Sequence, residues 1–119
     1  MDTSEFKKEF MDEADKQLAV MDSSLKNLDN KALVEMSRAA HILKSSSATM
    51  GYNQIANLSK AMEETLNEII NKKIEITPTI RDVLAECVSA LAELIKAVDK
   101  SEKESNVDEL IAKLKDILK

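Results

Sequence analysis

The chain has 119 residues, enough for one domain with one hydrophobic core, and its single cysteine excludes a disulfide-linked scaffold. Its net charge is −5 and its 17 basic residues are scattered among 22 acidic ones, which argues against a nucleic-acid partner. No apolar run approaches the ~20 residues of a membrane span, and the first ten residues lack the apolar core of a signal peptide, so the cytoplasm is the expected compartment, with no membrane partner. One glycine, one proline, two phenylalanines and one tyrosine are too few for a β-sandwich or barrel, so helices are expected throughout.

Apolar residues at spacings of three and four predict the first two helices. The first is expected to end at Leu28, with Asp2 and Glu5 as a candidate capping pair at its start. A short loop then returns the chain antiparallel into the second helix, which stops at Gly51, a typical C-terminal residue. The inward positions are Phe6, Phe10, Ala14, Leu18, Met21, Leu25 and Leu28 in the first helix and Leu33, Met36, Ala40, Leu43 and Ser47 in the second.

Polar residues with helix-starting chemistry precede the third and fourth helices. Asn53 is the expected N-cap of the third, whose pattern fades between Asn71 and Glu75. Thr77 followed by Pro78 starts the fourth, because proline fits the first helical position after a capping threonine. The inward positions are Ile55, Leu58, Met62, Leu66 and Ile69 in the third helix and Ile80, Leu84, Cys87, Leu91, Leu94 and Val98 in the fourth.

A shorter amphipathic helix is expected after the polar link from Asp99 to Ser105. It covers about residues 106–118, with Val107 and Leu114 among its apolar positions. The pattern leaves open whether this helix docks on the other four or leads into a linker.

These elements predict an all-α fold, an antiparallel up-down-up-down four-helix bundle with an additional short C-terminal helix. The bundle is expected over about residues 3–100, within one domain of residues 1–119. A free coiled coil is the structural alternative, but Gly51 and the Thr77–Pro78 pair interrupt any continuous heptad pattern.

His41 is the only histidine in the chain, and it is expected to face water. At 100° per residue it lies about 120° from the apolar stripe of its helix. Ser37, Ser45 and Ala48 are expected on the same side, and Lys44 is a direct neighbour three residues on. An imidazole in a small, polar and uncluttered patch is suited to act as a nucleophile or as a carrier of a phosphoryl group.

Glu63 is the residue best placed to orient this ring. His41 lies ten residues before Gly51 and Glu63 lies twelve after it, so both are about 15 to 18 Å from the turn that joins their helices. Whether the two side chains meet depends on the handedness of the bundle, which periodicity does not provide. If they meet, a carboxylate that accepts from Nδ1–H leaves Nε2 with a free lone pair. Lys44 would then place a cation beside any phosphoryl group on Nε2.

Ordinary structural explanations also exist for these residues. A single surface histidine often has no function, and glutamates such as Glu63 commonly form a solvated helix face. Cys87 lies on a core stripe and is expected to be an inert buried thiol. One histidine without a convergent cysteine or aspartate cluster disfavours a metal site, and one glycine cannot build a phosphate-binding loop. We therefore expect the chain to bind neither a metal nor ATP by itself.

The stretch from Ala39 to Tyr52, AAHILKSSSATMGY, followed by Leu58 and by the pair Met62-Glu63, resembles the signature of the histidine phosphotransfer (HPt) family. In that pattern a histidine is followed after two residues by a lysine, then by small residues, by a glycine after the helix and by a glutamate one helix later. The Ala-Thr-Met-Gly-Tyr ending, the restart at Thr77 and the fifth helix are most similar to the N-terminal phosphotransfer domains of chemotaxis histidine kinases of the CheA type. The resemblance covers the whole chain.

The resemblance implies a role for three of these residues. His41 would be the phosphorylated residue, Glu63 its hydrogen-bonded orienting carboxylate and Lys44 the cation that stabilises the phosphate.

Other positions would belong to the docking surface. Lys60, one turn before Glu63, occupies a place where the chemotaxis domains often carry a second polar or histidine side chain, and it joins Ser37, Ser45 and Ala48 as a candidate docking residue. Two positions depart from the family pattern: Ser45 stands where a glycine is usual directly after the lysine, and Ile42 stands where serine or threonine is common.

The resemblance also implies the partners. A separate ATP-binding kinase domain, with its Mg²⁺, would present the γ-phosphate to Nε2 of His41, and the phosphoryl group would then pass to an aspartate in the CheY-like receiver domain of a response regulator. The chain would be the phosphoacceptor domain of a sensor histidine kinase, a substrate and relay with little catalysis of its own.

Two other functions are compatible with the sequence. A stand-alone relay protein between a hybrid kinase and a terminal response regulator would need the same His41, and only the sequence that follows Lys119 separates it from the chemotaxis interpretation. A structural helical adaptor would not need His41 at all.

Overall fold

The computed structural model describes residues 3–119, and within that range it contains five helices and no strand. They are α1 (Thr3–Leu25), α2 (Asn30–Met50), α3 (Asn53–Lys72), α4 (Pro78–Asp99) and α5 (Asp108–Asp116). The expected all-α fold class, with four long helices and a short C-terminal one, is confirmed.

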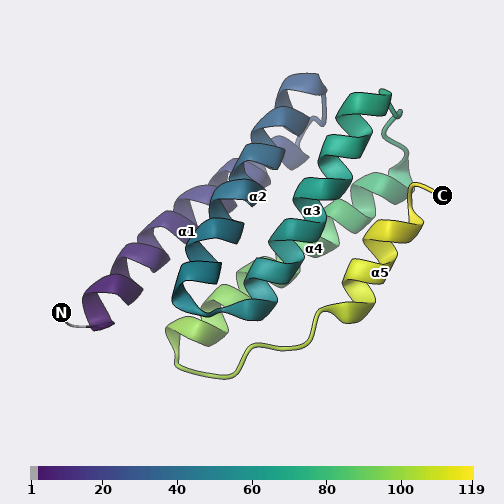
Figure 1. Cartoon of the computed structure of the whole chain (residues 1–119). Helices are drawn as coiled ribbons and strands as arrows, with labels where there is room; N and C mark the ends of the chain where they lie inside the picture. The colour runs from purple at the N-terminus through teal and green to yellow at the C-terminus, as the bar shows by residue number, and fades with distance from the viewer. Residues whose placement is uncertain (1–2) are drawn as a thin grey trace.

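The four long helices run alternately up and down, and each packs against the next along the chain (Figure 1). Because α4 also contacts α1, they close into a bundle, and the most extensive of these contacts joins α2 to α3. The molecule is elongated, with extents of 46 × 27 × 20 Å. The long axis follows the helices, so a residue in the middle of α2 lies on the flank of the molecule (Figure 1).

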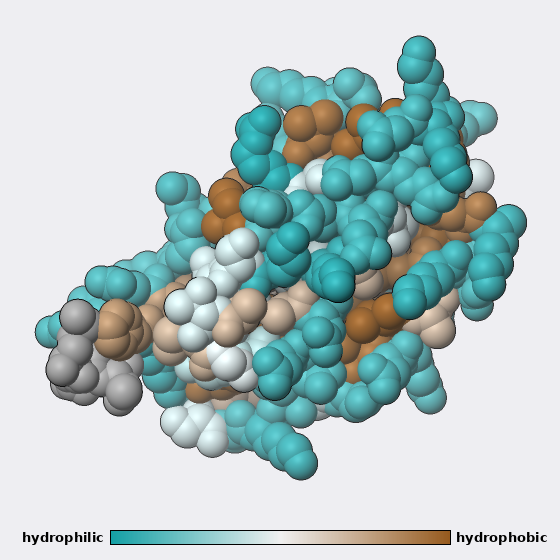
Figure 2. All heavy atoms as spheres, in the orientation of Figure 1, coloured by the Kyte–Doolittle hydropathy of each residue, from teal (hydrophilic) through white to brown (hydrophobic). Residues whose placement is uncertain are grey.

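The apolar stripes predicted from the spacing converge on one core. Met36, Leu43, Leu66 and Leu91 are among its fully buried members, and polar side chains cover most of the face seen in Figure 2, with apolar patches between them. The expectation for Phe6 was wrong, because its side chain is 42% exposed. Phe6 lies in the first turns of α1, at the end of the bundle where α2 stops and no further turn covers it.

The helix ends at Thr77 and Gly51 follow the predicted chemistry, whereas the cap by Asp29 was not predicted. The Asp29 carboxylate accepts from the Ala32 N–H at 2.8 Å at the start of α2, and Thr77 Oγ1 accepts from the Ile80 N–H at 3.2 Å at the start of α4. Gly51 ends α2 with φ of 77°, a left-handed conformation that a residue without Cβ adopts readily.

The end of α1 differs from the prediction. The helix stops at Leu25, and Leu28 packs against the core from the following loop. An apolar residue three positions after Leu25 has the same spacing whether it extends the helix or folds back from a loop, so periodicity could not separate the two cases. The candidate capping pair of Asp2 and Glu5 depends on Asp2, which lies outside the described residues.

The N-terminus of α3 is capped by a residue that the sequence analysis did not consider. Asn53 begins the helix, but no side chain of the preceding residues provides the cap. Instead, the Glu104 carboxylate accepts from the Gln54 N–H at 3.3 Å and from the Ile55 N–H at 2.8 Å. Glu104 belongs to the segment between α4 and α5, so the prediction for Asn53 was wrong because a distant acidic residue satisfies the same free N–H groups.

The fifth helix docks on the bundle, which resolves the alternative left open by its pattern. It packs against α3 and α4, and Val107 and Leu114 are buried there (Figure 1). The Val107 N–H also donates to Gln54 Oε1 at 3.3 Å. None of the helices in residues 3–119 is long and apolar enough to cross a membrane.

Candidate functional site

His41 lies midway along α2, on the side that faces solvent. Its side chain is 57% exposed, as expected from its angle to the apolar stripe. The neighbours along the helix, Ala40 and Leu43, are fully buried. The ring therefore stands on a helix whose opposite face is held firmly in the core.

The shoulder of α3 that carries Glu63 faces His41, so the bundle has the handedness that brings the two side chains together. Glu63 Oε2 is 2.7 Å from His41 Nδ1. An ionised carboxylate can only accept hydrogen bonds, so Nδ1 carries the proton and donates. The neutral ring then holds its remaining lone pair on Nε2, the nitrogen on the far side from Glu63.

Lys44 also binds Glu63. Its ammonium group donates to Glu63 Oε1 at 2.7 Å, so the two carboxylate oxygens serve two different residues of α2. Burial of the carboxylate alone would raise the pKa of Glu63, but the hydrogen bonds and charges of Lys44 and His41 outweigh it and hold that pKa below its ordinary value. Glu63 is therefore charged, and a reliable acceptor for Nδ1–H, throughout the neutral range.

A shallow hollow of about 360 Å³ opens beside this pair. His41, Glu63 and the exposed Arg38 border it, and the partly buried Val34 and Ile70 provide an apolar wall. A group that enters this hollow thus meets the cationic Arg38 one turn from His41 and an apolar wall about two turns away.

The candidate docking residues fall into two groups. Ser45, Ala48 and Lys60 are exposed, as a docking role requires. Ser37 is only 8% exposed, so the expectation that it adds to the open patch around His41 was wrong. It lies nearer the α2–α3 contact than its angle alone suggested, and its hydroxyl donates to Asn67 Oδ1 at 2.6 Å.

The sequence analysis missed two residues of this region, Asn67 and Arg38. Asn67 follows Glu63 by four residues and so shares its face of α3, a signal that the spacing contained. Arg38 precedes His41 by three residues and is its neighbour on the surface of α2.

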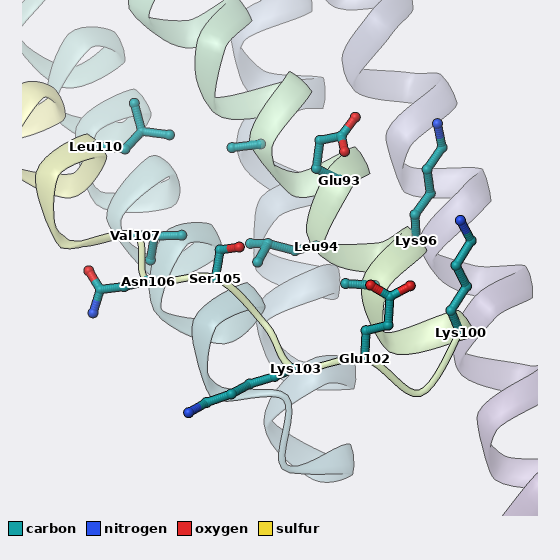
Figure 3. A pocket seen from close by; sticks show the side chains of 12 residues that line it. Glu93, Leu94, Lys96, Lys100, Glu102, Lys103, Ser105, Asn106, Val107 and Leu110 are labelled. Atoms are coloured by element: carbon teal, nitrogen blue, oxygen red, sulfur yellow. The ribbon is translucent and has the colours of Figure 1, made fainter.

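Another hollow lies between α4 and the segment that leads to α5 (Figure 3). It has a volume of about 480 Å³. Its lysines, Lys96, Lys100 and Lys103, extend outward from the rim and do not converge on one point (Figure 3). No residue of the network around His41 lines it, so it lies apart from the candidate site.

Other chemistry has little support in residues 3–119. No group of three or more histidine, cysteine, aspartate or glutamate side chains is arranged to hold a metal ion. Cys87 is fully buried, and desolvation, followed by the nearby Glu86 charge, raises the pKa of its thiol to about 12. A thiol of that kind is protonated and shielded in the folded protein.

Known proteins resemble this chain over most of its length. The family model of the Hpt domain matches residues 5–101. A chemotaxis protein CheA of Listeria monocytogenes is 35% identical over 94 residues, which cover 75% of this chain and 15% of that protein. CheA of Bacillus subtilis is 32% identical over 120 residues, covering 96% of this chain and 18% of that protein. A sensor histidine kinase CheAY of Helicobacter pylori is 27% identical over 127 residues, with 98% of this chain and 16% of that protein covered. The chain thus spans less than a fifth of the length of these relatives.

Proposed function

The chain belongs to the family of Hpt domains, and from this premise we propose that His41 accepts a phosphoryl group from ATP through a separate kinase domain and passes it to an aspartate of a response regulator in chemotaxis signalling. The observation that carries the proposal is the 2.7 Å contact between Glu63 and Nδ1 of a histidine whose ring is more than half exposed. A structural helix pair has no need for a partly buried carboxylate that orients an exposed imidazole.

The first transfer uses the lone pair of His41 Nε2. It attacks the γ-phosphorus of ATP in line, the bond between that phosphorus and the β–γ bridging oxygen breaks, and ADP leaves with the electron pair. The ring gains positive charge as the N–P bond forms, and the Glu63 carboxylate at Nδ1–H stabilises that charge. Lys44 keeps Glu63 ionised and lies on the same flank as the new phosphoryl group.

The second transfer reverses these electron movements. A carboxylate oxygen of the receiver aspartate attacks the phosphorus, the N–P bond breaks, and the electron pair returns to Nε2. His41 is then ready for another cycle, with Nδ1 still bonded to Glu63.

The rest of the catalytic machinery belongs to the partners in this proposal. The kinase domain supplies ATP and Mg²⁺, and a CheY-like receiver domain supplies the acceptor. A relay that is charged from ATP is expected in the cytoplasm, which we propose as its location. The exposed position of His41 on a rigid helix suits a residue whose Nε2 must be reached first by the kinase domain and then by the receiver domain.

The proposal is tested with His41→Gln and a CheA-type kinase domain supplied with γ-labelled ATP. We expect the wild-type chain to take up label in a linkage that acid cleaves and alkali does not, and His41→Gln to fold with the same helix content but take up none. Undiminished labelling of His41→Gln would refute the assignment.

Glu63→Ala provides a second, graded test of the same site. Without the carboxylate the ring loses its orientation, and phosphorylation is expected to slow by roughly ten- to a hundredfold, the range known for removal of the partner that orients a metal-binding histidine, with no change in helix content. Equal rates would show that Glu63 does not orient the ring.

A further inference from the structure

A second polar link joins α2 to α3 one helical turn from the histidine–glutamate pair. The Ser37 hydroxyl donates to Asn67 Oδ1 at 2.6 Å. Ser37 lies four residues before His41 and Asn67 four residues after Glu63, and the two helices are antiparallel. The two hydrogen bonds are therefore neighbouring rungs across the same seam, about 6 Å apart along the helices.

The Ser37–Asn67 rung joins shorter side chains than the Lys44–Glu63 pair, which also links α2 to α3. Serine has one rotatable side-chain bond and asparagine has two, whereas the bond between Lys44 and Glu63 joins two long, adaptable side chains. A long pair can stay bonded while the helices slide or separate slightly. A short pair can form only within a narrow range of helix separation and register, because hydrogen bonds weaken steeply away from their best geometry.

The Ser37 hydroxyl forms this link although a local alternative exists. A helical serine can donate to the carbonyl four residues earlier in its own helix, as Ser47 does to the Leu43 carbonyl at 2.6 Å and Ser24 does to the Val20 carbonyl at 2.9 Å. Ser37 instead reaches across to the neighbouring helix, and it is only 8% exposed, so water competes little for the bond.

The core alone does not provide this precision. The apolar contacts between α2 and α3 are strong but non-directional, so they set the distance between the helices more closely than the axial register. Glu63 meets Nδ1 of an exposed ring at 2.7 Å, and this contact requires both the correct distance between the helices and the correct axial register.

We propose that Ser37 and Asn67 are positioning residues for phosphotransfer: their hydrogen bond holds α2 and α3 at the register at which Glu63 reaches His41 Nδ1. The inference rests on the function proposed above. Neither residue touches the phosphoryl group, and both act through the orientation of the histidine ring.

The test compares Ser37→Ala with a matched control, Ser47→Ala, in the full chain. Both variants remove a buried hydroxyl from α2, but the Ser47 bond stays within its own helix. Nitrogen-15 NMR of the imidazole reads the tautomer of His41 without any partner, and labelling with the kinase domain and ATP reads the rate of transfer. We expect wild type and Ser47→Ala to hold a single tautomer with the proton on Nδ1.

Ser37→Ala is expected to lose that preference. Its ring should exchange between tautomers, and its phosphorylation rate constant should fall by about tenfold at unchanged KM for the chain, because the nucleophile is misoriented while the docking surface is intact. Ser37→Thr keeps the hydroxyl and should restore both readouts. Asn67→Ala should reproduce Ser37→Ala, and the double variant should be no worse than either single one, because the two residues share one interaction.

Two results would overturn the inference: a Ser37→Ala variant with the wild-type tautomer and rate, or one that is slowed while its tautomer is unchanged. Failure of the proposed function looks different, since the wild type would then accept no phosphoryl group while the tautomer of Ser37→Ala still shifts. If Ser37→Ala fails to fold, as circular dichroism would show, Asn67→Ala at an exposed position decides the question.

Discussion

Glu63 is only 16% exposed, yet it keeps its charge because both of its oxygens accept from donors on α2. Burial by itself would raise the pKa of this carboxyl, and the two donors lower it further than burial raises it. The residue therefore links stability to function, because the interactions that keep it ionised are those that orient the histidine.

This balance predicts a pH dependence. Because the pKa of Glu63 is lower in the folded chain than its ordinary value of 4.5, its contribution to stability is complete above that value and is lost as the pH falls through the lower folded pKa. We expect the urea midpoint of Glu63→Gln to lie below that of the wild type at pH 7, and the difference to shrink near pH 3.

Glu68→Gln is the control for this experiment. Glu68 is paired only with Lys72 on the surface of α3, and such exposed pairs contribute little. Its variant should differ little from the wild type at either pH. A Glu63→Gln difference that is as large at pH 3 as at pH 7 would contradict the expected linkage.

At this scale the sequence predicted where His41 and Glu63 lie along their helices better than how they bond. The angle of His41 to its stripe predicted its exposure, and the similar distances of His41 and Glu63 from Gly51 placed both at one level, but neither showed whether the two side chains face each other. The handedness of the bundle is a property of how four helices pack, and no single helix contains it. The same limit explains Ser37, whose angle suggested solvent while the packing of α3 covers it.

Among the helices, the start of α3 shows how a local rule can be replaced by a distant residue. Asn53 has the right chemistry for an N-cap, but the Glu104 carboxylate satisfies the free N–H groups from a segment about fifty residues further along the chain. Local sequence patterns indicate a cap only from residues next to the helix, so they predicted the cap at Thr77 correctly and the cap at Asn53 wrongly.

The cap can be tested by a matched pair of variants. Glu104→Ala removes two hydrogen bonds and a negative charge at a helix N-terminus, and we expect it to lower the free energy of unfolding by about 0.5–2 kcal/mol. Asn53→Ala should change it by less than about 0.5 kcal/mol, because its side chain provides no cap. Urea denaturation at pH 7 measures both free energies of unfolding. A larger loss of stability in Asn53→Ala than in Glu104→Ala would show that Asn53, and not Glu104, provides the cap.

At the scale of the whole molecule, the buried apolar side chains form one core, and this core contains a cysteine whose reactivity can report on opening of the bundle. Cys87 is fully buried and the pKa of its thiol is raised to about 12, so a thiol reagent can reach and attack it only when the bundle opens. The docking of α5 adds the fully buried Leu114 to this core, which a periodic pattern could not reveal because an amphipathic helix looks the same whether it docks or not.

Labelling of Cys87 with a chromogenic disulfide at pH 8 is therefore expected to be slow in the native chain and fast in urea. Leu114→Ala leaves a cavity that costs about 2–5 kcal/mol, and it should speed the labelling of the native chain at least tenfold. His41→Gln, at an exposed position, should not change the rate. Equal labelling rates with and without urea would mean that Cys87 is accessible in the folded state.

The position of His41 midway along α2 has a practical consequence for work with this chain. The imidazole lies about 14 to 17 Å from either end of its helix, so a partner must approach it from the side, roughly perpendicular to the helix axis. A fluorophore or surface tether attached at the Lys26–Asn27 turn, or at the opposite end of the bundle near Gly51, would therefore leave the middle of the bundle, where His41 lies, accessible. Immobilised in this way, the chain would present its reactive nitrogen sideways to partners passing in solution.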